Sequence, residues 1–403
     1  MSRTLFESAA KGDQNLLERA LNSEFGYLDH TDINQALLRA AQNGNAECVS
    51  RLLAEGADVD CDDYDGDTPL MLAAANNHVK VVKLLIFCGC DINLQSDRYR
   101  CALHMAIWNR CRQCMYLLLE AGCDINLQER YGDTPLMLAA RRGYTEAVRI
   151  LLDQEDCEVN TKSHEKDTAL HYAADNGHAE CLRLLLDHSP DLDASTLWGY
   201  TPLMFAAMAG QADCTQLLLE AGADFVVVER GMKSALHYCA DRNLTVALRY
   251  CLSLGANPDV RDSDGNTPLH HAVINKHPSA AKVLIQHGAS VQLVGKNTVG
   301  RKFAFFTCLE IATYQQSLDI AALLLACGAQ LAARNVRSHP DMRVPDEMLR
   351  MVASELNSPP SLQCLCRCSL RAPQLGSSLP DRIERLPLPK SLKGFLMFEE
   401  FDF

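Results

Sequence analysis

One short pattern recurs along most of this chain at an almost constant interval. It is a triplet of a small residue, then proline or alanine, then leucine, and its copies begin at Thr68, Cys101, Thr134, Thr168, Thr201, Ser234 and Thr267. The steps between successive copies are 33, 33, 34, 33, 33 and 33 residues. A fixed period of this length predicts a stack of similar units, each burying its apolar face against its neighbours. A single compact core is therefore disfavoured for this chain of 403 residues.

The residues within each unit predict a pair of short helices. Threonine can cap the first helix, and proline fits its first turn, where no amide hydrogen bond is lost. Small residues such as Ala73-Ala74 follow and allow close helix packing, and a leucine run comes next. A turn such as Gly122-Cys123-Asp124 then ends the second helix, with glycine in a left-handed conformation. This pattern resembles the ankyrin repeat.

Weaker copies extend the pattern in both directions. Leu5 and Ala36-Leu37 mark copies upstream, and Cys308-Leu309 marks one downstream, after a step lengthened by seven residues. The expected fold is an all-α ankyrin-repeat solenoid of about nine to ten repeats over residues 1–338, with atypical terminal units as caps. The lengthened step contains the run 301–306, Arg-Lys-Phe-Ala-Phe-Phe, which we expect to pack rather than to recognise a target.

Composition narrows the possible partners. Lys and Arg total 38 against 51 Asp and Glu, and the resulting net charge of −13 disfavours nucleic acid and anionic membranes. No segment approaches the ~20 apolar residues that span a bilayer, and the N-terminus lacks the apolar stretch of a secretory signal. We therefore expect a soluble intracellular protein that is cytoplasmic, with the nucleus as a second compartment.

The 18 cysteines and the recurring histidines raise the question of metal or catalytic sites. Most of the cysteines lie in apolar helical stretches, where they suit packing in a reducing compartment. Histidine alternates with methionine at the fourth position of the pattern, and we expect local hydrogen bonds there, as the repeat signature implies. Phosphate loops, Gly-x-Ser-x-Gly elbows and His-Glu-x-x-His helices are absent from the sequence, so we expect no cofactor, no metal site and no enzymatic activity.

Positions that vary between units could bind a protein target. The large or cationic side chains at such positions are Trp108, Tyr131, Arg141, Arg142 and Trp198. Tryptophan, tyrosine and arginine are the usual energetic anchors of interfaces, so these residues form our candidate substrate-binding surface. Packing between repeats is an equally good explanation for them. Asn93 and Asn126 lie in contexts similar to ankyrin sites that are hydroxylated on asparagine, although hydrogen bonding within the turn is the favoured reading.

The pattern fades after residue 338. Residues 339–358 read as a linker with a short docking helix over Asp346–Leu356, and Pro359-Pro360 then opens a separate C-terminal segment, 359–403. In a helical reading, Leu362, Leu365, Cys366 and Leu370 form one apolar stripe.

This segment resembles the SOCS box, a small three-helix module. Ser361, Leu362, Cys366 and Leu370 match its elongin-binding pattern, in which the leucine enters a pocket of elongin C. The cullin box is matched by Ile383, Leu386, Pro387, Leu388 and Pro389, whose Leu-Pro-aliphatic-Pro core is associated with cullins of the fifth class. Pro373 departs from the family, which commonly continues the first helix past this point.

The resemblance to ankyrin-repeat and SOCS-box proteins implies a substrate-recognition adaptor of a ubiquitin ligase. Its partners would be elongin B, elongin C, a fifth-class cullin with its RING subunit, and a protein substrate that the sequence does not name. It would promote ubiquitination and proteasomal degradation of that target. The alternative is a non-catalytic ankyrin scaffold without a ligase role.

Overall fold

The structure is a computed structural model that describes residues 2–21, 29–299 and 302–329. It divides into two compact units, unit 1 at Met1–Asp191 and unit 2 at Leu192–Phe403. The described part of each unit consists almost entirely of short helices that are consecutive in pairs.

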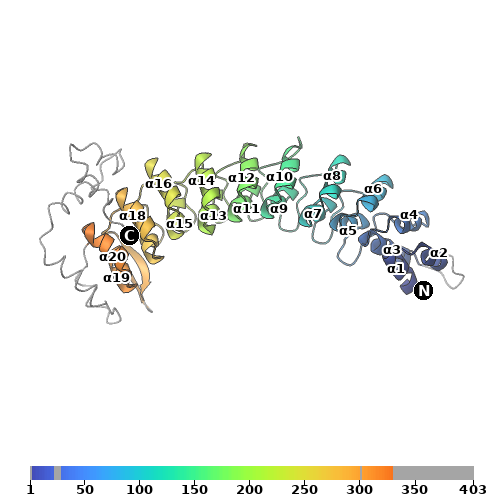
Figure 1. Cartoon of the computed structure of the whole chain (residues 1–403), viewed down its shortest axis with the longest axis horizontal. Coiled ribbons are helices and arrows are strands. Elements are labelled where there is room, and N and C mark those ends of the chain that lie inside the picture. The colour runs from blue at the N-terminus through green and yellow to red at the C-terminus, as the bar shows by residue number, and fades with distance from the viewer. Residues whose placement is uncertain (1, 22–28, 300–301, 330–403) are drawn as a thin grey trace. The chain divides into compact units, whose positions relative to one another are not determined.

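Unit 1 contains six helix pairs among its described residues. They are α1 (Ser2–Lys11) with α2 (Gln14–Leu21), α3 (His30–Gln42) with α4 (Ala46–Ala54), α5 (Pro69–Ala75) with α6 (Val79–Phe87), α7 (Ala102–Trp108) with α8 (Arg112–Glu120), α9 (Pro135–Arg141) with α10 (Thr145–Leu152), and α11 (Ala169–Asp175) with α12 (Ala179–Leu186). The first helices of successive pairs form one layer and the second helices form another (Figure 1).

Unit 2 repeats this arrangement with four described pairs and one hairpin. The pairs are α13 (Pro202–Ala209) with α14 (Ala212–Glu220), α15 (Ala235–Asp241) with α16 (Thr245–Ser253), α17 (Pro268–Ile274) with α18 (Pro278–Gln286), and α19 (Cys308–Tyr314) with α20 (Leu318–Ala326). The strands are β1 (Val294–Val299) and β2 (Lys302–Thr307). Together, the six described helix pairs of unit 1 and the four of unit 2 confirm the predicted all-α ankyrin fold.

The recurring triplet positions the first helix of each pair. Thr134 is the N-cap of α9, and its hydroxyl oxygen accepts the amide of Met137 at 3.3 Å. Pro135 follows at the first helical position, where its missing N–H costs nothing. The turn glycine also behaves as predicted, since Gly122, after α8, has φ +78°. Local capping therefore sets the helix boundaries that the period indicated.

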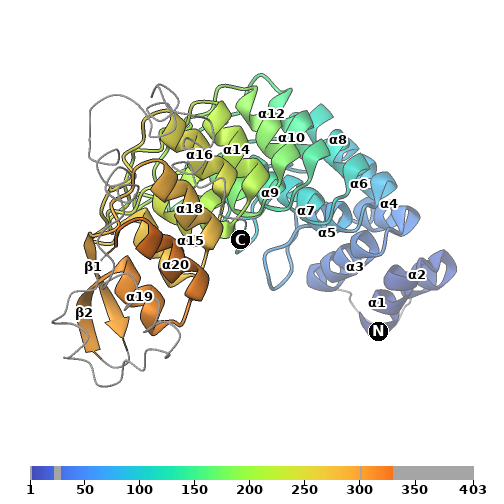
Figure 2. The same cartoon turned by 60° about the vertical axis from the view of Figure 1, so that its left-hand side comes forward.

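The lengthened step in unit 2 folds as an antiparallel hairpin, which the sequence pattern did not indicate. Val294 pairs with Thr307 and Val299 pairs with Lys302. Phe306 in β2 is fully buried, as expected of a packing segment. Thr307 ends the strand and caps α19 reciprocally with Glu310, so the hairpin leads directly into the next helix pair (Figure 2).

Candidate functional site

Four of the five residues predicted to bind a target lie in unit 1. Trp108 is the last residue of α7, Arg141 is the last residue of α9, and Arg142 follows it. Tyr131 lies in the loop before α9 and is 65% exposed. Trp198 lies in unit 2 and is 57% exposed. The structure thus groups Trp108, Arg141 and Arg142 at the ends of two neighbouring first helices.

Trp108 holds two arginine side chains against its indole ring. The guanidinium carbon of Arg142 is 4.3 Å from the ring centroid, and that of Arg100 is 5.2 Å from it. Arg142 Nη2 also donates a hydrogen bond to the Trp108 carbonyl oxygen at 3.1 Å. Cation–π contacts of this kind contribute about 0.5–2 kcal/mol each, depending on solvation. Trp108 therefore packs between repeats and at the same time positions two cations.

A buried carboxylate network lies beside this stack. Arg100 Nε is 2.7 Å from Glu129 Oε2, and Arg141 Nη1 is 2.8 Å from Asp133 Oδ2. The Tyr172 hydroxyl donates to Asp133 Oδ1 at 2.8 Å. Both carboxylates are almost completely buried. Buried charges require such pairing. Glu129 and Asp133 therefore fix the side chains of Arg100 and Arg141 and neutralise their charges.

Burial shifts the pKa values of carboxyl groups in this region. It raises the pKa of Asp133 above its usual range, and the hydrogen bond from Tyr172 and the charge of Arg141 limit that rise. Burial also raises the pKa of Asp167 to about 6, with Asp133 and other acidic neighbours adding to the effect. Asp167 Oδ1 is buried and has no hydrogen-bond partner among the described residues. The charge of the Asp167 carboxylate is therefore less well compensated than that of Asp133.

The sequence pattern did not indicate four members of this network. They are Arg100, Glu129, Asp133 and Tyr172. One signal was present, because Arg100 occupies the position before the triplet where other units carry Asp67 and Asp167. A reversed charge at that position points to a carboxylate partner nearby, but the sequence alone does not identify Glu129 as that partner.

Trp198 belongs to a comparable contact within unit 2. The Arg230 guanidinium carbon is 4.9 Å from its ring centroid, and the Arg230 amide donates to the Trp198 carbonyl oxygen at 3.1 Å. Nearby in the chain, Met232 is 52% exposed. The loops before α13 and α15 thus lie side by side and present apolar and cationic side chains to solvent.

His271 in α17 is placed between two carboxylates. Its Nδ1 is 2.8 Å from Asp241 Oδ1, and its Nε2 is 2.8 Å from Asp262 Oδ2. Burial alone would lower the pKa of His271, but the hydrogen bonds to Asp241 and Asp262 outweigh it and raise the pKa above the usual value. The same contacts lower the pKa of Asp262, against the effect of its burial. The three groups form a buried ionic bridge inside unit 2.

The recurring histidines of the repeat cap helices. In α11, His171 Nδ1 accepts the backbone amide of Thr168 at 3.1 Å, and α7, α15 and α17 begin with the same capping box. Because an amide can only donate, Nδ1 is unprotonated in each ring. Burial lowers the pKa of His104, His237 and His270 to about 4, in agreement with neutral rings. The predicted local hydrogen bonds are confirmed.

The cysteines show the same packing character. The described cysteines form no disulfides, and all of them except Cys88 and Cys157 are buried. Burial raises the pKa of thiols such as Cys61 and Cys114 to about 12. Within the described ranges, no group of three or more His, Cys, Asp or Glu side chains could hold a metal ion.

Asn93 and Asn126 connect neighbouring repeats. Asn93 Oδ1 accepts the amide of Asp124 at 2.8 Å, and Asn126 Oδ1 accepts the amide of Glu158 at 3.1 Å. Asp60 and Asn160 make the corresponding bonds to the turns of their following units. These side chains therefore form a ladder along the turns, instead of bonding only within their own turn. Hydroxylation of the two asparagines stays a prediction.

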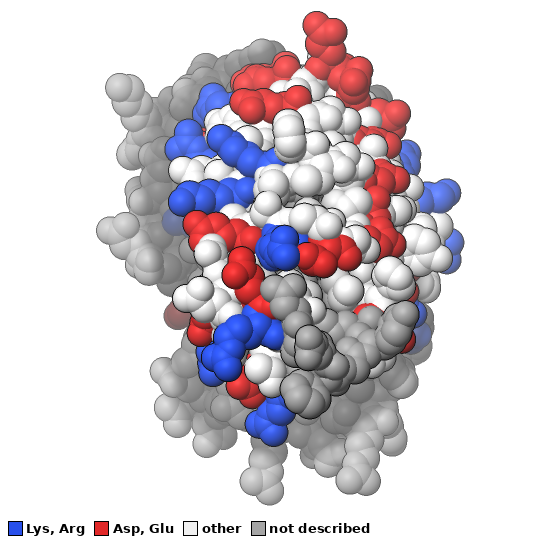
Figure 3. All heavy atoms as spheres, turned by 90° about the vertical axis from the view of Figure 1, so that its right-hand side faces the viewer, with Lys and Arg blue, Asp and Glu red and all other residues white. Residues whose placement is uncertain are grey.

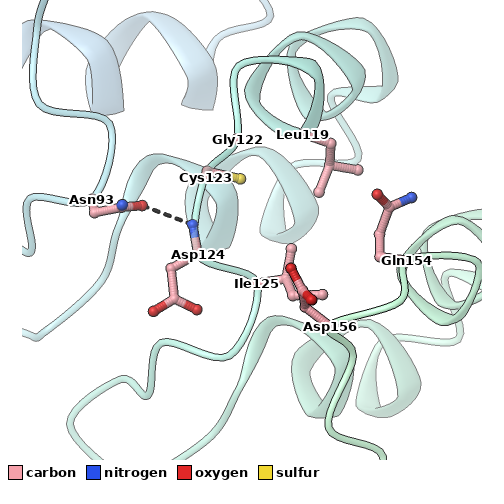
Figure 4. A pocket seen from close by; sticks show the side chains of 8 residues that line it. All are labelled: Asn93, Leu119, Gly122, Cys123, Asp124, Ile125, Gln154 and Asp156. Carbon is pink, nitrogen blue, oxygen red and sulfur yellow. Dashed lines mark hydrogen bonds between the residues drawn. The ribbon is translucent and has the colours of Figure 1, made fainter.

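A pocket of about 320 Å³ adjoins this ladder. Its lining residues are Asn93, Leu119, Gly122, Cys123, Asp124, Ile125, Gln154 and Asp156 (Figure 4). The dashed line in Figure 4 is the bond from the Asp124 amide to Asn93, so this wall of the pocket already serves the stacking of repeats.

The surface at the end where α1 and α2 lie carries both signs of charge. Acidic and basic side chains both occur there, and uncharged side chains cover a wide area between them (Figure 3). Acidic and basic side chains are thus interspersed on the described part of this face. The part of the chain that the structure describes contains no helix long and apolar enough to cross a membrane.

The predicted ligase-binding residues fall outside the described residues. These are Ser361, Leu362, Cys366 and Leu370 for elongin, and Ile383, Leu386, Pro387, Leu388 and Pro389 for cullin. The predicted docking helix and the boundaries at 339–358 and 359–403 lie there as well. Their assignments stay predictions.

Two family models match this chain. The model described as "Ankyrin repeats (3 copies)" matches residues 5–96, 71–163, 103–196, 155–229 and 236–335. The model described as "SOCS box" matches residues 358–397. The ankyrin matches cover most of the chain, and the SOCS box follows them at the C-terminal side.

Two of the curated relatives carry the same two features in their names. Ankyrin repeat and SOCS box protein 11 of Mus musculus is 31% identical over 170 residues, which are 42% of this chain and 50% of that protein. Ankyrin repeat and SOCS box protein 9 of Homo sapiens is 31% identical over 144 residues, 35% of this chain and 46% of that protein. Protein fem-1 homolog C of Bos taurus is 39% identical over 69 residues, 14% of this chain and 11% of that protein. The chain spans about half the length of the first two relatives. With both family models matched in order along it, the chain belongs to the family of ankyrin repeat and SOCS box proteins.

Proposed function

We propose that this protein is a substrate-recognition adaptor of a ubiquitin ligase. Its ankyrin repeats hold a target protein, and its SOCS box binds elongin B, elongin C and a fifth-class cullin with its RING subunit. The observation that carries this proposal is the SOCS box match at 358–397, which follows ankyrin matches that end at residue 335. The relatives named for the same two modules support an adaptor role in ubiquitin ligase complexes. The proposal places the protein in the cytoplasm, with the nucleus as a second compartment.

Within the SOCS box, one short apolar motif binds the elongins and a second one binds the cullin. Leu362 is the anchor in elongin C, Cys366 is a small packing residue and Leu370 extends the apolar stripe. Segment 386–389 contacts the cullin in this proposal, and its two prolines are residues that favour an extended backbone at low entropic cost.

The adaptor itself performs no chemistry in this proposal. Binding a target and a ligase with one chain raises the effective concentration of the target lysine at the partner enzyme. Burial keeps buried thiols such as that of Cys114 protonated, which suits packing and not nucleophilic attack. The degradation signal on the target then comes from the ligase and not from this chain.

One co-purification series tests the ligase contacts. Leu362→Asp should abolish elongin recovery, whereas Leu375→Asp, a matched change outside both motifs, should leave it intact. Replacing Leu386 and Pro387 with alanine should lose the cullin and keep the elongins. Elongin recovery with Leu362→Asp equal to wild type would overturn the proposal.

The target surface is proposed at Trp108, Tyr131, Arg141, Arg142 and Trp198. Support comes from the stacked guanidinium group of Arg142 and from the exposure of Tyr131 and Trp198. Combined Trp108→Ala and Trp198→Ala should release targets and retain elongins. Full retention of every target by the double variant would remove these residues from the interface.

A scaffold without a ligase role is the second candidate function. Pro373 favours it, because we expect a proline to end a helix at this position, where the family pattern continues it. Deleting 359–403 distinguishes the two functions. An adaptor predicts that the targets accumulate after the deletion, and a scaffold predicts unchanged target abundance.

A further inference from the structure

Unit 1 carries a surface that combines exposed tyrosines with unpaired arginines. We call it the arginine–tyrosine face and define it by Arg98, Tyr99, Arg130, Tyr131 and Arg142. Tyr99 is 58% exposed and Tyr131 is 65% exposed, and both lie at the tips of the loops that precede α7 and α9. The Arg130 amide donates to the Arg98 carbonyl oxygen at 3.0 Å, so the two tips lie side by side.

Arg142 joins this face through contacts below the tips. Arg100, two residues after Arg98, lies over the Trp108 ring, and the Arg142 guanidinium lies over the same ring. The Arg142 side chain is further fixed by its bond to the Trp108 carbonyl oxygen. The Trp108 ring thus links the tip before α7 to the end of α9 through Arg100 and Arg142.

Charge compensation separates two sets of arginines on this surface. Arg100 and Arg141 are paired with the buried carboxylates of Glu129 and Asp133. In contrast, no carboxylate of the described residues lies within ion-pair distance of Arg98, Arg130 or Arg142, although the charge of Arg98 does lower the pKa of the nearby Asp67 carboxyl. The three arginines outnumber Asp97, the exposed carboxylate in the same loop tip as Arg98, so the face is locally cationic in a chain whose net charge is −13.

We propose that the arginine–tyrosine face binds an extended, acidic segment of the target protein, through Asp or Glu carboxylates. Guanidinium groups pair with carboxylates in a bidentate geometry, and a side chain already fixed by stacking loses less entropy when it does so. The exposed tyrosine rings supply apolar contact area beside these ion pairs. The inference rests on the proposed adaptor function, and it names the class of segment that the ankyrin repeats recognise.

Charge-matched variants of the full chain, purified with the elongins, test this assignment. The face variant combines Arg98→Glu, Arg130→Glu and Arg142→Glu. The control variant combines Lys80→Glu, Lys83→Glu and Arg149→Glu, an equal charge change at exposed positions on the second helices α6 and α10. Four labelled peptides of equal length serve as probes: one rich in glutamate with interspersed leucines, and its glutamine, lysine and phosphoserine counterparts.

Fluorescence anisotropy at several salt concentrations should show salt-sensitive binding of the glutamate peptide to wild type. The face variant should weaken this binding by about tenfold or more, since each exposed ion pair contributes up to about 1 kcal/mol. The control variant should bind within about twofold of wild type.

Three outcomes would overturn the inference. These are equal loss in both variants, no preference for the glutamate peptide over the glutamine one, and binding of the phosphoserine peptide alone. Elongin recovery in the same preparations separates this result from the proposed function. If the face variant still co-purifies with the elongins but no longer binds the glutamate peptide, the peptide site is assigned to the face. If Leu362→Asp still co-purifies with the elongins, that result counts against the adaptor proposal alone.

Discussion

Replacing His271 with leucine should destabilise unit 2 by an amount that depends on pH. Both ring nitrogens of His271 lie 2.8 Å from carboxylate oxygens, of Asp241 on one side and Asp262 on the other. A neutral imidazole has one N–H, so only the protonated ring can donate to both carboxylates. The leucine side chain retains apolar volume but leaves both acids without their shared cation.

The size of the effect follows from the surroundings of the two acids. Asp262 is 5% exposed and loses the partner of Oδ2, while its Oδ1 still accepts the amides of Asp264 and Asn266. Removing one partner of a buried ion pair costs about 3–5 kcal/mol. Because Asp241 retains access to water, we expect the lower end, about 3 kcal/mol. The same change in an Asp262→Asn background should cost clearly less, because the two residues are coupled.

The pH dependence has a definite sign. Since the folded pKa of His271 is raised, its contribution is fully present below the ordinary histidine value of about 6.5 and is lost as pH rises through the folded pKa. His237 and His270 act in the opposite direction, because their pKa values near 4 make unit 2 lose stability as pH falls from about 6.5 to about 4. The leucine variant should keep this acid-side loss and lack the alkaline decline.

The two tryptophans of the chain permit a separate measurement for each unit, because Trp108 lies in unit 1 and Trp198 in unit 2. In a Trp108→Phe background, urea unfolding followed by Trp198 fluorescence reports unit 2. A destabilisation by His271→Leu of less than about 1 kcal/mol at pH 6.5, or one that is constant up to pH 9, would refute the ionic-bridge reasoning.

Three further predictions concern other parts of the structure. Phe306→Ala should destabilise the hairpin region by about 3–5 kcal/mol, seen as faster amide exchange in β2 and α19, because its side chain is fully buried; unchanged exchange would contradict its packing role. Asp167→Asn should stabilise unit 1 by about 1 kcal/mol at pH 7 and by nothing below pH 4, because a folded pKa of about 6 means that only the ionised carboxylate is destabilising. Urea unfolding followed by Trp108 fluorescence in a Trp198→Phe background measures this change. An equal gain in stability at both pH values would exclude ionisation of Asp167 as its cause. Val226→Asp should extend the turn ladder to the Asn257 amide, as Asp193 does for Asp224, and slow exchange of that amide by about fivefold; unaltered exchange would show that the side chain does not reach it.

Local chemistry explains why the helix pairs could be predicted. Each triplet contains its own cap, as Thr134 does for α9, and the glycine that ends the second helix lies within the same period. Such contacts join residues three to four positions apart, so they can be read from a short stretch of sequence. The histidines were predictable for the same reason, since His171 bonds to Thr168 in its own unit.

The carboxylate network could not be predicted because its partners meet only through stacking. Arg100 and Glu129 are 29 positions apart, and Tyr172 and Asp133 are 39 positions apart. The hairpin was missed for a related reason. Its two strands pair only once the chain has folded back on itself, and β2 reads as an apolar run that could equally belong to a loop packed on the last repeats.

Trp108 illustrates how packing and recognition can use one side chain. Its ring contacts Arg100 of its own repeat and Arg142 of the next one, which is the packing explanation. The contact with Arg142 also holds that guanidinium at the surface, which is the recognition explanation. The two explanations are therefore compatible. Trp108→Leu should weaken peptide binding by loosening Arg142, whereas a residue that only packed would affect stability alone.

The way the repeats are joined explains why the fold, but not the target, can be read from the sequence. Neighbouring loop tips are connected through backbone groups, as in the bond from the Arg130 amide to the Arg98 carbonyl oxygen, and the turns are connected by the asparagine and aspartate ladder. Neither set of bonds uses the side chains at the tips. Tyr131 and Trp198 can therefore occupy equivalent positions in different units without a cost to stacking. Because the tip side chains take no part in these bonds, target binding determines which residues occur there. These residues do not recur with the period of the repeat, so the period does not reveal the target.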